Sequence, residues 1–151
     1  MADIAVDFLV HLLEPCPGGR DEPKGHRAAP SLDSTWVVQK IKAGLPAQSF
    51  AVLLEAIRIP AERLASLIQI PTRTLARRKV FKVDESERIL RLGRLYQRTL
   101  EVLGTPEEAR RWLLRPQKAL GNIAPLDFAD TEPGAREVEA LLGRLEHGVF
   151  S

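Results

Sequence analysis

The chain has 151 residues, of which 44% are hydrophobic and 28% are charged, as is ordinary for a globular protein with one compact domain or two small ones. No stretch approaches the roughly 20 apolar residues of a membrane-spanning helix, and Asp7 and His11 interrupt the apolar run near the start, so we expect no membrane partner and no signal peptide. A single cysteine, Cys16, cannot form an internal disulfide, which fits a cytoplasmic location.

The net charge of +2 conceals an uneven distribution along the chain. Residues 1–34 carry 3 basic and 6 acidic side chains, residues 35–104 carry 13 and 6, and residues 105–151 carry 6 and 8. The densest basic part, residues 71–82, holds five basic residues and no acidic one. Such a region attracts phosphate, although a solvated face of Lys and Arg would give the same pattern.

The predicted elements begin with an N-terminal extension over residues 1–34, made of a short helix and a linker rich in Pro and Gly. From Thr35 onward, apolar residues recur with helical spacing. A helix over residues 34–43 should end at Gly44 and Pro46, and the next helix carries a buried ridge. This ridge consists of Phe50, Leu53, Leu54 and Ile57.

Residues 61–80, AERLASLIQIPTRTLARRKV, show the pattern of a helix-turn-helix: two short amphipathic segments joined by a turn with a proline. Pro60 opens the first segment, and Ala65 supplies the small residue needed where the two helices touch. Gln69 occupies the turn position where the backbone becomes left-handed and where glycine is common. The motif predicts binding to double-stranded DNA.

The second segment is the predicted DNA-reading helix, and its polar and basic residues are the DNA-binding candidates. They are Thr72, Arg73, Thr74, Arg77, Arg78, Lys79 and Lys82. We expect Thr72 to cap this helix and bond a phosphate. Arg73, Thr74 and Arg77 should face base edges, and the later basic residues should meet the DNA backbone. Arg73 and Arg77 are the specificity candidates, because residues four apart share a helix face and arginine can hold guanine through two hydrogen bonds.

The sequence leaves one alternative for these basic residues. Arg77 or Arg78 could form an ion pair with an acidic residue such as Glu62 or Glu85 in place of a DNA contact. Because one recognition helix rarely gives enough affinity, we expect a homodimer that reads two half-sites.

A long helix is predicted from Asp84, with Glu87 as its capping-box partner, to about Leu103, where Gly104 ends it. Its buried stripe consists of Ile89, Leu92, Tyr96 and Leu100. Asp84 and Glu87 stand four residues before Arg88 and Arg91 and could pair with them.

Two further helices are predicted in the C-terminal third. Thr105, Pro106 and Glu108 mark the start of the first, which ends at Pro116. After a turn-rich stretch, Asp130 or Thr131 caps the last helix, and Gly148 ends it. No strand-like alternation of useful length occurs, so the predicted fold class is all-α, with an N-terminal extension (1–34), a helix-turn-helix and dimerisation region (35–104) and a C-terminal domain (105–151).

The sequence offers no catalytic or metal-binding pattern. It has no Gly-rich phosphate loop, no HExxH, no GxSxG and no cysteine pair for zinc. The histidines, at positions 11, 26 and 147, show no metal-ligand spacing. We therefore expect a protein that is not an enzyme and that has no catalytic residue, metal or cofactor.

The C-terminal third combines an acidic balance with an apolar end, Val149 and Phe150 after Gly148. Apolar groups at a free terminus usually find a partner, so this end predicts a protein-binding surface. The alternative is a tail that folds back on its own core.

Several runs of sequence resemble the Xre/MbcA/ParS antitoxins, the partners of RES-domain toxins. The resemblance covers about residues 36–151, and its C-terminal part is long and specific. The runs are Gly44-Leu45-Pro46, TLARRK at 74–79, DESERILRLGRLYQRTLEVLG directly after Val83, WLLRPQKALGN at 112–122 and PLDFADTEPGAREVEALLGRLEHGVFS at 125–151.

This resemblance implies an antitoxin of a RES-Xre type II toxin–antitoxin system, with a Cro/C1-like helix-turn-helix domain followed by a helical toxin-binding domain. Such a protein covers the active site of a NAD-degrading RES toxin and represses its own operon promoter. The implied toxin-binding residues are Pro125, Leu126, Asp127, Glu146, His147, Gly148, Val149, Phe150 and Ser151. The alternative is a free-standing transcription regulator whose C-terminal helices only dimerise.

Overall fold

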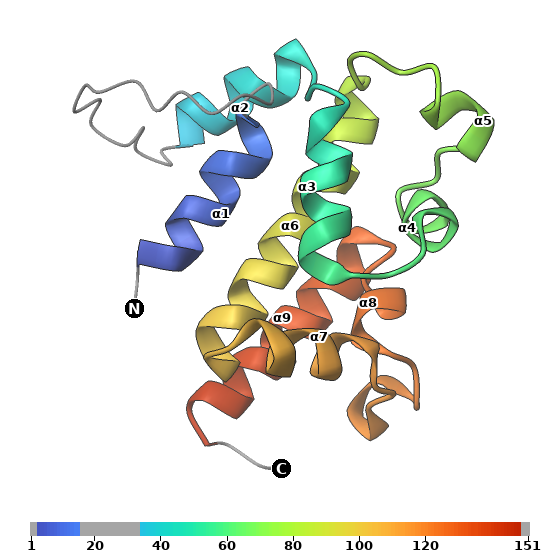
Figure 1. The fold of residues 1–151 in the computed structure, drawn as a ribbon. Helices are drawn as coiled ribbons and strands as arrows, with labels where there is room; N and C mark the ends of the chain where they lie inside the picture. Colours follow the sequence, from blue (N-terminus) through green and yellow to red (C-terminus); the bar gives the residue numbers. More distant parts are fainter. Residues whose placement is uncertain (1–2, 16–33, 149–151) are drawn as a thin grey trace.

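The computed structural model describes residues 3–15 and 34–148, and this part of the chain is built from helices (Figure 1). The helices are α1 (Asp3–Leu13), α2 (Ser34–Ala43), α3 (Gln48–Ile57), α4 (Ala61–Leu67), α5 (Thr72–Leu75), α6 (Val83–Leu103), α7 (Pro106–Leu114), α8 (Pro125–Phe128) and α9 (Glu132–Glu146), with a 3₁₀ turn, η1, at Lys118–Leu120. In the described residues, β pairing is limited to two isolated antiparallel bridges, Pro46 with Val80 and Gln117 with Ile123. The predicted all-α fold class is confirmed.

The long helix α6 runs through the middle of the molecule and contacts elements from both ends of the chain (Figure 1). Helices α1, α2 and α3, which precede α6 in the chain, pack against it, and so do α7 and α9, which follow it. Its predicted stripe, Ile89, Leu92, Tyr96 and Leu100, is buried. One continuous apolar core therefore joins the two halves of the chain. Within residues 3–15 and 34–148, no helix combines the length and the hydrophobicity needed to cross a membrane.

The start of α6 differs from the prediction by one residue and by its capping partner. Lys82 is the N-cap, and its backbone N–H donates to the Glu85 carboxylate at 2.8 Å. The predicted capping box of Asp84 and Glu87 is wrong, because Glu85 stands three residues after the N-cap and fills that role. Asp84 instead accepts a hydrogen bond from Arg88 at 3.0 Å. Gly104, with φ of 92°, ends the helix as predicted.

The helix of the N-terminal extension docks on the core. Leu12 and Leu13 of α1 are fully buried against α3 and α6. The Ser49 hydroxyl donates to the Leu12 carbonyl at 2.6 Å, so a carbonyl near the C-terminal end of α1 is satisfied from α3. Gly93 of α6 lies so close to Leu12 that a Cβ there would be 2.3 Å from its Cδ2 atom.

The C-terminal helices begin at the predicted caps. The Thr105 hydroxyl accepts from the Glu108 N–H at 3.3 Å, and the Thr131 hydroxyl accepts from the Gly134 N–H at 3.2 Å. At Gly134, α9 passes so close to α8 that a Cβ would lie 1.9 Å from the Phe128 carbonyl oxygen. The turn-rich stretch between α7 and α9 contains η1 and the short helix α8.

Candidate functional sites

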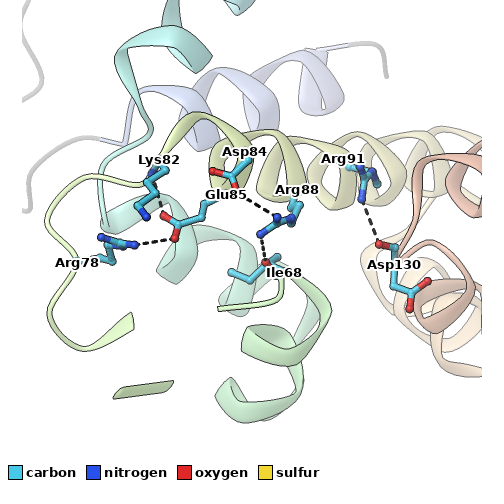
Figure 2. Close-up of polar contacts among 8 residues, drawn as sticks. All are labelled: Ile68, Arg78, Lys82, Asp84, Glu85, Arg88, Arg91 and Asp130. Atoms are coloured by element: carbon cyan, nitrogen blue, oxygen red, sulfur yellow. Dashed lines mark hydrogen bonds and ion pairs between the residues drawn. The ribbon is translucent and has the colours of Figure 1, made fainter. Parts of the chain in front are cut away.

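The helix-turn-helix consists of α4, a tight turn and α5. Gln69 has φ of 58°, so the left-handed turn predicted at this position is confirmed without a glycine. Ala65 is 1% exposed, and its carbonyl accepts from the Ile70 N–H across the turn at 3.0 Å. Arg88 of α6 donates to the Ile68 carbonyl at 3.2 Å, as Figure 2 shows. The turn is therefore held from the central helix as well as from within the motif.

Helix α5 is shorter than the predicted DNA-reading helix. It ends at Leu75, and the N–H groups of Arg77 and Arg78 donate to carbonyls three residues back, at 3.1 and 3.2 Å. Arg77 thus lies in a turn beyond the helix, and the prediction that it shares a helix face with Arg73 is wrong. The predicted cap is wrong too, because the extended backbone of Pro71 makes Pro71 the N-cap and places Thr72 inside the helix.

The basic side chains of this region divide into free and paired groups. Within the described ranges, no carboxylate lies within ion-pairing distance of four of them. These four, which we call the basic surface, are Arg73, Arg77, Lys79 and Lys82, and all are exposed. Val80 and Val83, 53% and 45% exposed, belong to the same segment, whereas Thr74 is half-buried.

Arg78 belongs to the paired group. Its Nη2 donates to Glu85 Oε1 at 2.8 Å, and Glu85 is only 7% exposed (Figure 2). The same carboxylate accepts the Lys82 backbone N–H through its second oxygen. The alternative left open from the sequence, an ion pair with Glu85, is therefore found for Arg78. Arg78 therefore joins residues 71–82, which we call the recognition segment, to the start of α6.

The first group of predicted toxin contacts, residues 125–127, lies on α8. Pro125 and Leu126 are buried in the protein's own core, Leu126 completely. The Leu126 side chain therefore has no exposed surface to offer a partner in this structure, and a toxin contact through residues 125–127 stays a prediction. Asp127 is half-buried and accepts from Arg63 Nη2 of α4 at 3.2 and 2.9 Å.

The second group of predicted toxin contacts lies at the end of α9. Glu146 accepts a hydrogen bond from Arg98 of α6, and this bond lowers the pKa of Glu146 below its ordinary value and raises the pKa of Arg98. His147 and Gly148 are exposed, and Gly148 has φ of 65°. The remaining predicted contacts, Val149, Phe150 and Ser151, lie outside the described residues.

Four sets of contacts that join the helix-turn-helix region to the C-terminal helices were missed from the sequence. They are the ion pairs of Arg63 with Asp127 and of Arg98 with Glu146, the bond from Arg110 to the Ala56 carbonyl at 2.7 Å, and the bonds from Arg91 to Glu132 and the Asp130 carbonyl at 3.1 and 3.2 Å. The partners lie 39 to 64 residues apart, so no local pattern could indicate them. Of the two ion pairs that the spacing on α6 allowed, Asp84 with Arg88 is found, whereas Arg91 turns to Glu132 in place of Glu87.

The described residues contain no group of three His, Cys, Asp or Glu side chains that could hold a metal ion. They do contain two hollows that are each lined by several residues of α9. The larger, about 550 Å³, lies between α2, α6 and α9, and the smaller, about 440 Å³, lies between α8 and the start of α9.

Comparison with known proteins matches both halves of the chain. Residues 37–94 match the antitoxin Xre-like helix-turn-helix domain, and residues 99–148 match the antitoxin Xre/MbcA/ParS C-terminal toxin-binding domain. Antitoxin Xre of Yersinia enterocolitica is 36% identical over 127 residues, which cover 81% of this chain and 86% of that protein.

Two further relatives are more distant. Antitoxin Xre of Pseudomonas putida is 31% identical over 150 residues, covering 97% of this chain and 76% of that protein. A Sphingobium protein named Prs ADP-ribosylating antitoxin is 25% identical over 139 residues, covering 83% and 85%. The chain belongs to the Xre/MbcA/ParS antitoxins, with an Xre-like helix-turn-helix DNA-binding domain followed by a C-terminal toxin-binding domain.

Proposed function

We propose that this antitoxin neutralises a NAD-degrading RES-domain toxin by covering the toxin's active site with its C-terminal region. In the same proposal it binds the promoter of its own operon as a homodimer and represses transcription. Both activities belong in the cytoplasm, where the promoter and the NAD pool are. The observation that carries the proposal is the direct succession of a DNA-binding match and a toxin-binding match along the shared helix α6.

The charge of the recognition segment supports the DNA-binding part. The four residues of the basic surface have no carboxylate partner among the described residues, so their charges are available to phosphates. Cationic side chains that replace condensed counterions supply most sequence-independent affinity for DNA. Arg73 and Arg77 stand nearest the start of this surface in sequence and remain the candidates for reading bases.

The name of one relative supports the NAD-degrading toxin. The Sphingobium antitoxin's name refers to ADP-ribosylation, a modification in which NAD supplies the ADP-ribose group. A toxin that consumes NAD is therefore chemically consistent with this family. The end of the chain from Glu146 onward is proposed as the blocking segment, because the exposed residues His147 and Gly148 lead out of the packed helix α9.

The test is co-expression with the cognate RES-domain toxin that this proposal requires, to be sought in the gene next to that of the antitoxin. The toxin alone should stop growth and deplete NAD, and the intact antitoxin should restore both. Deleting residues 147–151 should abolish neutralisation and leave promoter binding intact. The double variant Arg73→Ala with Arg77→Ala should do the reverse, so each variant controls for the folding of the other.

Three results would contradict the proposal. NAD that stays constant while the toxin acts would exclude the proposed substrate. Growth arrest that persists despite abundant intact antitoxin would exclude neutralisation. Unchanged promoter occupancy in the double arginine variant would exclude the basic surface as the DNA-binding element.

A further inference from the structure

The smaller hollow, beside α8, has an apolar lining and an acidic rim. Its apolar wall is formed by Ile123, Phe128 and Pro133, and its acidic residues are Asp127, Asp130 and Glu137. No basic residue lines it. Ile123 is 44% exposed and is the only large hydrophobic side chain among the described residues of the toxin-binding match to be exposed to this degree.

Main-chain contacts build this hollow. The Gln117 N–H donates to the Ile123 carbonyl at 3.2 Å in an isolated antiparallel bridge, which fixes the backbone of Ile123. On the other side, Gly134 lets the first turn of α9 approach the Phe128 carbonyl. The apolar surface is therefore held in place by backbone geometry, and a partner need not order it on binding.

The charge of the rim indicates the chemistry of the occupant. Asp127 is paired with Arg63, but within the described part of the chain the carboxylates of Asp130 and Glu137 have no ion-pair partner. The larger hollow differs, because basic and acidic residues such as Arg91, Arg94 and Glu139 share its rim. Of these two hollows, only the smaller one combines an apolar wall with charged residues that are all acidic.

We propose that this hollow, which we call the α8 hollow, is a docking site for the toxin. A toxin side chain that is large and apolar fills the space between Ile123 and Phe128, and a flanking Lys or Arg of the toxin faces Asp130 and Glu137. Buried apolar anchors supply most of the affinity at protein interfaces, while rim charges set the association rate. This inference rests on the proposed function and adds a contact separate from the C-terminal end of the chain.

The test uses the full-length antitoxin and its purified cognate RES-domain toxin, with binding followed by biolayer interferometry. Ile123→Asp should raise the Kd about tenfold or more. Glu137→Lys should lower the association rate and weaken its dependence on salt. Glu139→Lys, two residues along α9 on the larger hollow, and Val38→Asp, at an exposed apolar position on α2, are the matched controls and should bind like the wild type.

The outcomes separate this inference from the proposed function. If Ile123→Asp and Glu137→Lys both bind the toxin as tightly as the wild type does, the docking site is refuted and the proposed function stands. If Glu139→Lys weakens binding as much as Glu137→Lys, the charge effect is not local and the docking site is again refuted. If the wild type does not bind the RES-domain toxin, the docking site and the proposed function are both refuted. Circular dichroism and promoter binding verify the fold, and Glu137→Lys, on an exposed helix face, provides the test should Ile123→Asp misfold.

Discussion

At the scale of single residues, Arg78 and Lys79 are adjacent in sequence but have different surroundings. Arg78 is half-buried and bonded to the nearly buried Glu85, whereas Lys79 is exposed and belongs to the basic surface. A cation already held by a carboxylate neutralises little additional charge on DNA. We therefore expect Arg78 to position the recognition segment and Lys79 to contact phosphate.

Replacing each residue by alanine should distinguish these roles. Both Arg78→Ala and Lys79→Ala should weaken promoter binding, but only Lys79→Ala should reduce the slope of log K against log salt, by about 0.9 for one lost phosphate contact. Arg78→Ala should also lower the free energy of unfolding by roughly 1–3 kcal/mol, because it leaves Glu85 buried without its partner. Lys79→Ala should stay within about 0.5 kcal/mol of the wild type.

Fluorescence anisotropy over a salt series measures the slope of promoter binding against salt, and urea denaturation measures the free energy of unfolding. Equal losses of slope for the two variants would show that Arg78 reaches the DNA backbone. An Arg78→Ala protein as stable as the wild type would show that the bond to Glu85 contributes little to the fold.

At the scale of elements, the junction of α8 and α9 depends on one glycine. An alanine Cβ at Gly134 would lie 1.9 Å from the Phe128 carbonyl oxygen, which is backbone and can move only with α8. Gly134→Ala should therefore destabilise the protein by about 1–3 kcal/mol or more, as overpacked sites do. Gly143, in the same helix, has nothing within 4 Å of the corresponding position, so Gly143→Ala should stabilise α9 by roughly 0.5–1 kcal/mol.

Urea unfolding of the two variants gives both free energies under the same conditions. If Gly134→Ala is neutral, the end of α8 yields easily, and the α8 hollow is less firmly built than the contacts indicate. If both substitutions stabilise, helix propensity outweighs the close approach.

Element ends were predictable from the sequence where their causes are local. The caps Thr105 and Thr131 and the terminating Gly104 act within one helical turn, and all three were found. The early end of α5 and the N-cap at Lys82 were not predictable. The segment between α5 and α6 is held by the bridge of Pro46 with Val80 and by the bond of Arg78 to Glu85. Because Pro46 is far from Val80 in the sequence, no local pattern indicates where α5 ends and α6 begins.

The difference between local causes and distant contacts also explains which site residues could be predicted from the sequence. The segment with the basic surface was found because charge density is visible in sequence, but which of its cations are free depends on Glu85, and Arg77 could not be separated from Arg78 beforehand. The family motif indicated residues 125–127, yet burial of Leu126 and pairing of Asp127 follow from packing against the core and α4. Membership of an antitoxin family also confirms the prediction that the chain is not an enzyme.

At the scale of the whole molecule, Tyr96 reports on the integrity of the core. It is the only tyrosine of the chain, it is 4% exposed, and its ring meets that of Phe8 edge-on at 4.9 Å. Burial raises the pKa of its phenol above the ordinary value of 10.0, and the nearby positive charge of Arg110 offsets part of this effect.

The sign of the pH dependence follows from this shift. Because the folded state holds the phenolic proton more tightly than the unfolded state, the stability due to Tyr96 is complete below the unfolded pKa and declines as pH rises through the folded pKa. Absorbance near 295 nm should show ionisation at higher pH in native protein than in urea. In Tyr96→Phe the alkaline decline should be smaller, and coincident titrations in buffer and urea would contradict the burial of this side chain.

The single helix α6 has a consequence for how the two activities are inherited. The matched regions meet between residues 94 and 99, inside α6, where Leu95 and Tyr96 are buried in the common core. Recombination between two antitoxin genes at this join would combine half-helices from different parents and mismatch the side chains that pack across it. Operator preference and toxin preference should therefore pass to descendants together, as one unit of variation.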